Sequence, residues 1–205
     1  MTAFEGFSTS DFETFHINGL EARMQAIRER IQPKFQVAGG LLAAELSAAC
    51  GDELFLHIAR HARRTVNPPP DTWLAIAASR RGYKQYPHFQ LGLFDDRLFL
   101  WLAFIDELPR KRDIAETFLA HMDMVQSAGR GLAVSLDHTK KTAVPLGELE
   151  LKAALERFRD VKACEWLIGR QLSADDARLA DGDAFMALAR ETFTALLPLY
   201  RLAFQ

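Results

Sequence analysis

The chain has 205 residues, of which 49% are hydrophobic and 25% are charged, and its formal net charge is −2 at pH 7. This length and apolar content predict one domain with a substantial buried core. The near balance of acids and bases argues against a disordered tail and against a general nucleic-acid coat protein. Cys50 and Cys164 have no metal-ligand spacing, which indicates reduced, packed thiols and argues against zinc.

No targeting or membrane segment is predicted. The N-terminal MTAFEGFSTSDFETF is acidic and lacks the basic and apolar regions of a signal peptide. The longest uninterrupted apolar run, Leu98 to Ile105, has eight residues, whereas spanning a bilayer takes roughly 20. We therefore expect a cytoplasmic protein without membrane association.

The first predicted element is a helix within residues 20–49. Apolar side chains recur there at helical spacing, with charged residues between them: Leu20, Met24, Ile27 and Ile31. Pro33 is expected to end or restart this helix, because proline suits a first turn but not a helix interior. A second helix would then run through LLAAELSAAC and stop at Gly51.

Strands are predicted next. Residues 72–79 (TWLAIAAS) are short, apolar and bounded by a proline run and a basic turn. Residues 88–94 and 97–105 flank Asp95–Asp96, which is the spacing of a tight β-hairpin. The second of these runs, RLFLWLAFI, is apolar on both faces, which is typical of a central strand covered on both sides.

Helices and strands then alternate to the C-terminus. We expect helices at residues 107–127, 147–158 and 183–201, and strands at residues 132–136 and 161–172. This order favours an α+β fold over a doubly wound one. The sequence thus predicts a single α+β domain over residues 1–205, with a central, largely antiparallel sheet packed with several helices.

Residues 57–88, called here the basic segment, concentrate positive charge and hydrogen-bonding groups. Six Lys or Arg side chains accompany the single acid Asp71, which gives a formal charge of +5, and three of the six histidines lie in the same segment. Such a segment predicts a bound anion, which is either a ligand or the protein's own carboxylates. The sequence leaves these two alternatives equally open.

Two arginine pairs, Arg63–Arg64 and Arg80–Arg81, flank the predicted strand 72–79. Paired guanidinium groups suit bidentate binding of phosphate or carboxylate. Whether the pairs lie at opposite ends of the strand or converge is left open. In the ligand interpretation the four arginines contact the anion, and Trp73 or Tyr83 forms an apolar wall. The polar partners of the ligand are then His57, His61 and His88.

Two other kinds of partner fit the basic segment. The stretch SRRGYKQYPHF interleaves cations with aromatic rings, which suits stacking on a nucleotide base or a nucleic-acid single strand, and also suits an ordinary surface loop. Because the segment holds so few cations, nucleic-acid binding is the second interpretation. The third is contact with an acidic protein partner or a second subunit, and monomer and homodimer remain alternatives.

The histidines provide candidates for catalysis. His57 and His61 form HIARH, which has the spacing of a zincin helix, but Ile58 replaces the glutamate of H-E-x-x-H, so no metal site is predicted. They are more simply explained as hydrogen-bond partners of carboxylates or carbonyls. If there is catalysis, a histidine titrating near neutral pH is the best acid–base candidate.

A second candidate group lies in SLDHTKK, where Asp137 and His138 follow a predicted strand. Loops at strand ends commonly carry functional side chains. A nucleophilic set of Ser135, His57 and Asp137 can be named, although any chain of this size offers one. The sequence identifies no cofactor and leaves open whether the protein is an enzyme.

Several stretches resemble a known family. They are GDELFLHIARHARRTVNPPPDTWLAIAASRRGYKQYPHFQLGLF, FETFHINGLEARM, LDHTKK, VKACEWLIGRQL and ETFTALLPLYRLA, which together cover nearly the whole chain. They are similar to the YktB-like family of uncharacterised bacterial proteins. The resemblance implies a single α+β domain with a central sheet and packed helices, and it implies no activity or catalytic residues. One departure is Pro70, which makes three successive prolines before Trp73.

Overall fold

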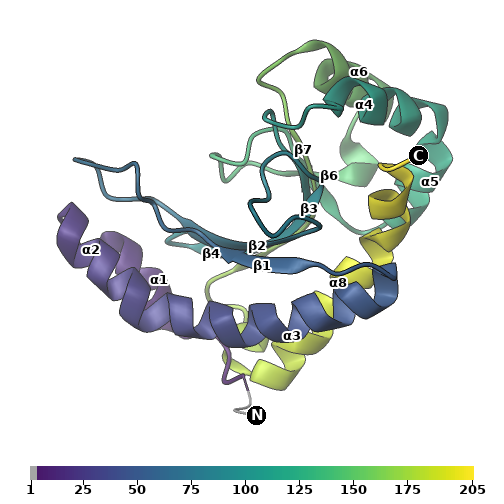
Figure 1. Ribbon diagram of the computed structural model, residues 1–205. Coiled ribbons are helices and arrows are strands. Elements are labelled where there is room, and N and C mark those ends of the chain that lie inside the picture. Colours follow the sequence, from purple (N-terminus) through teal and green to yellow (C-terminus); the bar gives the residue numbers. More distant parts are fainter. Residues whose placement is uncertain (1–3) are drawn as a thin grey trace.

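An antiparallel sheet forms the centre of the protein, and the computed structural model describes residues 4–205 (Figure 1). Within these residues the sheet has seven strands, and every pairing between neighbours is antiparallel. In spatial order the strands are β1 (Phe55–Ile58), β2 (Thr72–Ala77), β3 (His88–Leu93), β4 (Arg97–Phe104), β7 (Trp166–Ser173), β5 (Ala133–Ser135) and β6 (Val144–Pro145). The expected α+β class with a central antiparallel sheet is confirmed.

Helices precede, interrupt and follow the strands along the chain. The α-helices are α1 (Thr9–Glu13), α2 (Leu20–Ala26), α3 (Gln32–Cys50), α4 (Lys111–Ala120), α5 (Met122–Ala128), α6 (Leu151–Asp160), α7 (Ala177–Ala180) and α8 (Gly182–Leu202). The shorter helical turns are η1 (Thr14–His16), a π-turn η2 (Ile27–Ile31) and η3 (Leu146–Glu148). No helix in residues 4–205 is both long enough and apolar enough to cross a bilayer.

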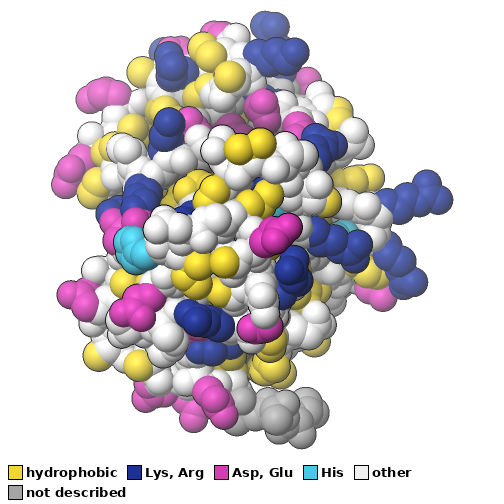
Figure 2. All heavy atoms as spheres, turned by 90° about the vertical axis from the view of Figure 1, so that its left-hand side faces the viewer, with side chains coloured by type: hydrophobic (Ala, Val, Ile, Leu, Met, Phe, Trp, Pro, Cys, Tyr) yellow, Lys and Arg dark blue, Asp and Glu magenta, His cyan; other side chains and the backbone are white. Residues whose placement is uncertain are grey.

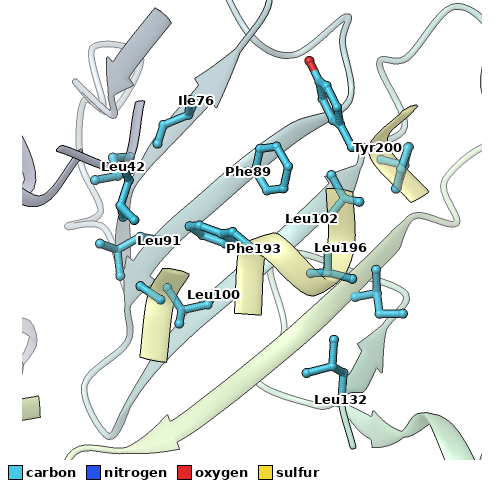
Figure 3. Close-up of a cluster of buried hydrophobic side chains, with 14 of the residues drawn as sticks. Leu42, Ile76, Phe89, Leu91, Leu100, Leu102, Leu132, Phe193, Leu196 and Tyr200 are labelled. Atoms are coloured by element: carbon cyan, nitrogen blue, oxygen red, sulfur yellow. The ribbon is translucent and has the colours of Figure 1, made fainter. Parts of the chain in front are cut away.

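One face of the sheet packs against α3 and α8, which lie below it in Figure 1. Alternate strand residues point to this side because side-chain direction has a period of two along a strand. Figure 3 shows how side chains of the strands meet those of the two helices, among them Ile76, Phe89, Leu91, Leu100, Phe193 and Leu196, all fully buried or nearly so. Each such side chain contributes about 1.5–3 kcal/mol by leaving water.

The opposite face of the sheet, called here the loop face, lies under connecting loops. It carries the alternate set of strand residues: His57, Trp73, Ala75, Ala77, His88, Gln90, Phe99, Trp101 and Leu167. Phe99, Trp101 and Leu167 form a second, smaller apolar cluster here. The loop face therefore combines an apolar patch with the polar side chains of His57, His88 and Gln90.

Two local predictions are confirmed. Asp95 and Asp96 join β3 and β4 in a tight hairpin, closed by the bond from the Phe94 N–H to the Arg97 carbonyl at 2.8 Å. Gly51 ends α3 in the left-handed conformation, with φ of 80°. Pro33 lies in the first turn of α3, directly after the π-turn η2. Proline is tolerated there because its missing N–H is not needed in the first turn of a helix, so the helix restarts at this point as predicted.

Other boundaries differ from prediction. The predicted helix 107–127 is divided at His121, whose φ is −127°, and α6 begins at Leu151. The strand predicted from Val161 begins only at Trp166, because the buried Lys111 ammonium binds carbonyls of residues 161, 162 and 164 and so holds this stretch outside the ladder. β1 was not predicted, since its residues lie at a half-buried sheet edge without an alternating pattern.

Candidate functional site

The polar side chains of the loop face form one connected cluster. Four of the six histidines gather there with two large aromatic side chains, and the members are His57, His61, Trp73, Tyr83, His88 and His138. Three of them come from β1, β2 and β3, whose register places their side chains on the same face. The others come from the loops before β2, before β3 and after β5.

Trp73 and Tyr83 form the middle of this cluster. The indole N–H of Trp73 donates a hydrogen bond to the Tyr83 hydroxyl at 2.9 Å. The Tyr83 ring lies 5.7 Å from the His57 ring and 4.9 Å from the His88 ring, and the Trp73 ring lies 6.4 Å from His138. Burial raises the pKa of Tyr83, so its hydroxyl stays protonated at neutral pH. Both residues expected to form an apolar wall therefore do lie together.

His88 is fully buried and neutral. Its Nδ1 donates to the carbonyl of Tyr86 at 2.8 Å, which leaves Nε2 to accept from the side-chain amide of Gln90, also at 2.8 Å. Burial lowers the pKa of His88 to about 4. A ring with both nitrogens hydrogen-bonded and a depressed pKa orders the sheet face and carries no charge at pH 7.

His61 and His57 are both hydrogen-bonded, but in different places. His61 has a φ of 50°, and its Nε2 lies 3.1 Å from the Thr72 hydroxyl. Burial and the nearby Arg64 charge lower the pKa of His61 to about 4. His57 donates from Nε2 to the Ser79 carbonyl at 2.8 Å. His57 thus bonds a backbone carbonyl, as the simpler interpretation of HIARH expects, whereas the partner of His61 is a hydroxyl group.

His138 and Glu165 form a tightly bonded pair. Antiparallel pairing of Ser135 with Leu167 brings the residues after β5 beside those before β7. The His138 Nδ1 lies 2.7 and 2.8 Å from the two Glu165 oxygens, and the His138 backbone N–H donates to Oε2 at 2.6 Å. Burial opposes protonation of His138, but the hydrogen bond and charge of Glu165 outweigh it and raise the pKa of His138.

The geometry of this pair settles which nitrogen of His138 is available. Since Nδ1 faces a carboxylate it carries the proton, and Nε2 forms no hydrogen bond within residues 4–205. The Glu165 side chain is only 4% exposed, whereas that of His138 is 33% exposed. A buried carboxylate therefore orients a partly accessible imidazole, which is the arrangement that general acid–base catalysis uses.

Asp71, in the loop before β2, is affected by the charge of the same histidine. It is 6% exposed and forms no ion pair within 4.0 Å among the described residues. Burial raises the pKa of Asp71 from 3.8 to about 6, although the charges of His138 and Arg64 oppose the rise. A buried carboxyl that titrates near neutral pH beside a polarised histidine is typical of functional sites.

A separate hollow of about 600 Å³ lies beside the edge strand β1, and we call it the edge hollow. Its lining residues are Gln32, Gln36, Leu56, His57, Ile58, Arg60, Arg80 and Arg81. A neighbouring hollow of about 570 Å³ shares His57, Ile58 and Arg81 and is bounded by Tyr83 and Lys84. His57 and Arg81 therefore lie between two recesses at the sheet edge.

Few of the cations in the basic segment have acidic partners. Arg80 approaches Glu53 at 3.7 Å with both side chains largely exposed, and Lys84 pairs with Glu107 at 2.5 Å. Within residues 4–205 the remaining four form no ion pair: Arg60, Arg63, Arg64 and Arg81. Lys and Arg side chains project from one edge of the molecule in Figure 2. Internal pairing thus accounts for two of the six cations.

The two arginine pairs lie at opposite ends of β2. Arg63–Arg64 belong to the loop between β1 and β2, and Arg80–Arg81 follow β2, whose end pairs with the start of β1. The edge hollow brings Arg80–Arg81 together with Arg60 and leaves Arg63–Arg64 outside it. Arg64 instead acts on His61 and Asp71 through its charge.

The set Ser135, His57 and Asp137 is not assembled. β1 and β5 are separated by four intervening strands, which corresponds to about 24 Å at ordinary strand spacing. Ser135 donates to the Asp137 carbonyl at 3.1 Å, and one Asp137 carboxylate oxygen accepts from the backbone and hydroxyl of Thr139. Asp137 therefore shapes the turn that presents His138.

The side-chain atoms of Asp137, His138 and Glu165 that could bind a metal ion lie within 4.8 Å of one another. Each of these carboxylates already accepts hydrogen bonds, Glu165 from His138 and from the Asp106 N–H at 3.3 Å. We assign no metal to this group.

Sequence reasoning missed Glu165, Asp71, Gln32, Gln36 and Arg60 as site residues. Glu165 had a detectable signal, since it is a lone acid between Cys164 and the apolar run that follows. The glutamines had none, because they lie on α3 and reach the edge hollow only through tertiary packing.

Comparison with known proteins identifies the family. The family model described as "Domain of unknown function (DUF1054)" matches residues 7–200. The chain belongs to this family.

A UPF0637 protein of Shouchella clausii is 58% identical over 199 residues, covering 97% of this chain and 94% of the relative. A UPF0637 protein of Oceanobacillus iheyensis is 57% identical, with 97% and 96% covered, and one of Listeria monocytogenes is 50% identical, with 98% and 99% covered. The resemblance to the YktB-like family is consistent with DUF1054 membership.

Proposed function

We propose that this DUF1054 protein is cytosolic and binds an anionic small molecule, bearing a phosphate or carboxylate group, in the edge hollow. The observation that carries the proposal is the convergence of Arg60, Arg80 and Arg81 on one recess beside His57. Arginine offers a planar fork of N–H donors that matches both anions. The volume, about 600 Å³, falls in the range of small-molecule sites, about 300–1,000 Å³.

The charge state of the lining supports an anion over an internal acid. Arg60 and Arg81 have no acidic partner within residues 4–205, and the Arg80–Glu53 contact of 3.7 Å joins side chains that are 78% and 72% exposed. Exposed pairs of this kind contribute about 0–1 kcal/mol and yield readily to a better partner. Amide groups of Gln32 and Gln36 add neutral hydrogen-bonding groups to the same lining.

The test uses inorganic phosphate, pyrophosphate and citrate as probes, with thermal shift and calorimetry as readouts. At least one probe is expected to raise the Tm of the wild type, and Arg81→Ala is expected to weaken that binding about 10–100-fold, which corresponds to one lost charge-assisted hydrogen bond. Arg63→Ala is the matched control, because it removes an equal charge outside the hollow. No Tm shift with any probe, or equal losses in the two variants, contradicts the proposal.

The same variants separate the two other partner classes. A nucleic-acid partner predicts binding of a single-stranded oligonucleotide that weakens steeply with salt and is lost in both Arg80→Ala and Arg81→Ala. A protein partner or second subunit predicts that Arg81→Glu changes the elution volume in sizing chromatography while anion binding is unaffected. Either result would replace the small-molecule proposal.

A further inference from the structure

A second recess, called here the adjoining hollow, has a volume of about 570 Å³ and shares His57, Ile58 and Arg81 with the edge hollow. Its further lining is Ser79, Gly82, Tyr83, Lys84, Gln85 and Tyr86. We propose that the two hollows together bind one nucleotide, with its phosphates among the arginines of the edge hollow and its base against the tyrosine rings of the adjoining hollow. A nucleotide is a particular case of the anion in the proposed function, so this inference rests on that proposal.

The charges of the two linings suit the phosphate end of a nucleotide. Among residues 4–205 neither lining contains Asp or Glu, whereas the edge hollow has three arginines. The Arg80 guanidinium lies 4.9 Å from the centre of the Phe55 ring, a cation–π contact that restricts its position. Lys84 already pairs with Glu107 at 2.5 Å and is not counted. Three guanidinium groups match a diphosphate better than a single phosphate or carboxylate, so we place a diphosphate there.

The two hollows are connected at His57 and Arg81, which line both. A phosphate group fills only a small part of a recess of about 600 Å³, so a ligand that occupies the space has a further portion. His57 donates from Nε2 to the Ser79 carbonyl at 2.8 Å, and its Nδ1 forms no hydrogen bond within residues 4–205. Nδ1 of the neutral ring is therefore an acceptor at the junction, where it suits a sugar hydroxyl between phosphate and base.

Two tyrosines give the adjoining hollow its aromatic lining. Tyr86 is 38% exposed and packs against no other aromatic ring in the described part of the chain. The Tyr83 ring is half-buried and lies against the His57 and His88 rings. An exposed ring without an aromatic partner is a stacking surface, and every nucleobase has a π-face that can stack on it. An aliphatic carboxylate such as citrate has no such face, so this lining favours a nucleotide.

Hydrogen bonds fix the turn that carries these two rings. The Tyr86 N–H donates to the Tyr83 carbonyl at 3.0 Å, and the Tyr86 carbonyl accepts from Nδ1 of His88 at 2.8 Å. The Tyr83 hydroxyl accepts from the Trp73 indole N–H at 2.9 Å. Because His88 and Trp73 belong to β3 and β2, the turn is anchored to the sheet at both ends. A wall that is already ordered loses little conformational entropy when a base stacks on it.

The experiment measures binding of adenosine, guanosine and uridine diphosphates and of pyrophosphate to the full-length protein by calorimetry. At least one nucleoside diphosphate is expected to bind about 10-fold more tightly than pyrophosphate, because a stacked base is added to similar charges. Tyr86→Ala is expected to remove this difference and to leave the affinity for pyrophosphate unchanged, whereas Tyr86→Phe, which keeps the ring, retains the difference. Phe204→Ala is the matched control, since Phe204 is 46% exposed and lines neither hollow.

Gly82→Leu tests the same assignment by filling the adjoining hollow. Gly82 belongs to its lining, and a Cβ atom added at Gly82 has no neighbour within 4 Å, so the fold accommodates a side chain there. The variant is expected to bind nucleoside diphosphates no more tightly than pyrophosphate. Retained binding of pyrophosphate shows that this variant and Tyr86→Ala are folded.

Failure of the nucleotide proposal is distinguishable from failure of the anion site. If pyrophosphate binds as tightly as every nucleoside diphosphate, the nucleotide is overturned and the anion site stands. The same holds if the difference survives in Tyr86→Ala or Gly82→Leu, or if Phe204→Ala removes it equally. If no phosphate probe binds to the wild type, both proposals are overturned. Tighter binding of a single-stranded oligonucleotide than of any nucleoside diphosphate overturns the nucleotide in favour of a nucleic-acid partner.

Discussion

Trp73 and Tyr83 are joined by a hydrogen bond of 2.9 Å, from the indole N–H to the phenol oxygen, that ties the loop before β3 to strand β2. On one side of this bond lie His57 and the hollows at the sheet edge, and on the other side lies His138. The pair therefore links the hollow that adjoins the edge hollow, which Tyr83 lines, to His138, which lies beside Trp73.

Tyr83→Phe is expected to lower the free energy of unfolding by about 1–2 kcal/mol, because it leaves the Trp73 N–H without its partner in a half-buried position. Urea unfolding of the variant and the wild type measures the change. Tyr86→Phe is the matched control, since Tyr86 is 38% exposed and we expect it to change stability by less than about 0.5 kcal/mol. Equal effects in the two variants would contradict the structural role of the bond.

Asp71→Asn is expected to stabilise the protein at pH 8 and to leave its stability nearly unchanged at pH 4. Burial raises the pKa of Asp71 in the folded state from 3.8 to about 6. The protonated Asp71 side chain therefore contributes fully to the free energy of unfolding below pH 3.8. This contribution, about 2–3 kcal/mol, is lost as the pH rises through 6. Asparagine cannot ionise, so the loss disappears. Differential scanning calorimetry at the two pH values checks this, and a Tm lowered at pH 8 would count against it.

His61→Asn is expected to make the protein less sensitive to acid. His61 is neutral in the fold with a pKa of about 4, so its contribution to stability is present above the unfolded pKa of 6.5 and is lost as pH falls toward 4. Asparagine tolerates the φ of 50° that this position requires. The difference in unfolding free energy between pH 7.5 and pH 5 should shrink by about 1–2 kcal/mol. His121→Asn, at an exposed position, should leave this difference unchanged.

Lys111→Met is expected to destabilise the protein by about 3 kcal/mol. The buried ammonium donates to the carbonyls of Val161, Lys162 and Cys164, and bonds from charged groups contribute about 1.5–3 kcal/mol. Methionine keeps the length of the side chain but offers no donor. Chemical denaturation measures the loss, with Lys152→Met, an exposed helix position, as the control. Hydrogen exchange should rise first in residues 161–165, and uniform exchange across the sheet would argue against a local anchor.

Local sequence patterns predicted the hairpin at Asp95–Asp96, the central position of β4 and the C-terminal helix α8. These features depend on residues close together in the chain, through turn chemistry and through the periods of 2.0 and 3.6 residues. Failures came where a distant residue intervened. Lys111 delays the start of β7 by binding carbonyls some fifty positions along the chain, and no local pattern encodes that contact.

In the candidate site, too, some features follow from the local sequence and others from contacts between distant residues. By itself the sequence determined the concentration of cations and histidines in residues 57–88 and the presence of Asp137–His138 after a strand. Only the tertiary structure decided that Glu165 orients His138, because this follows from the pairing of Ser135 with Leu167. It also decided that Arg60 joins Arg80–Arg81 while Arg63–Arg64 lie at the other end of β2. Composition fixes which charges a chain carries, whereas strand register fixes which of them meet, and register depends on partners that the local sequence does not name.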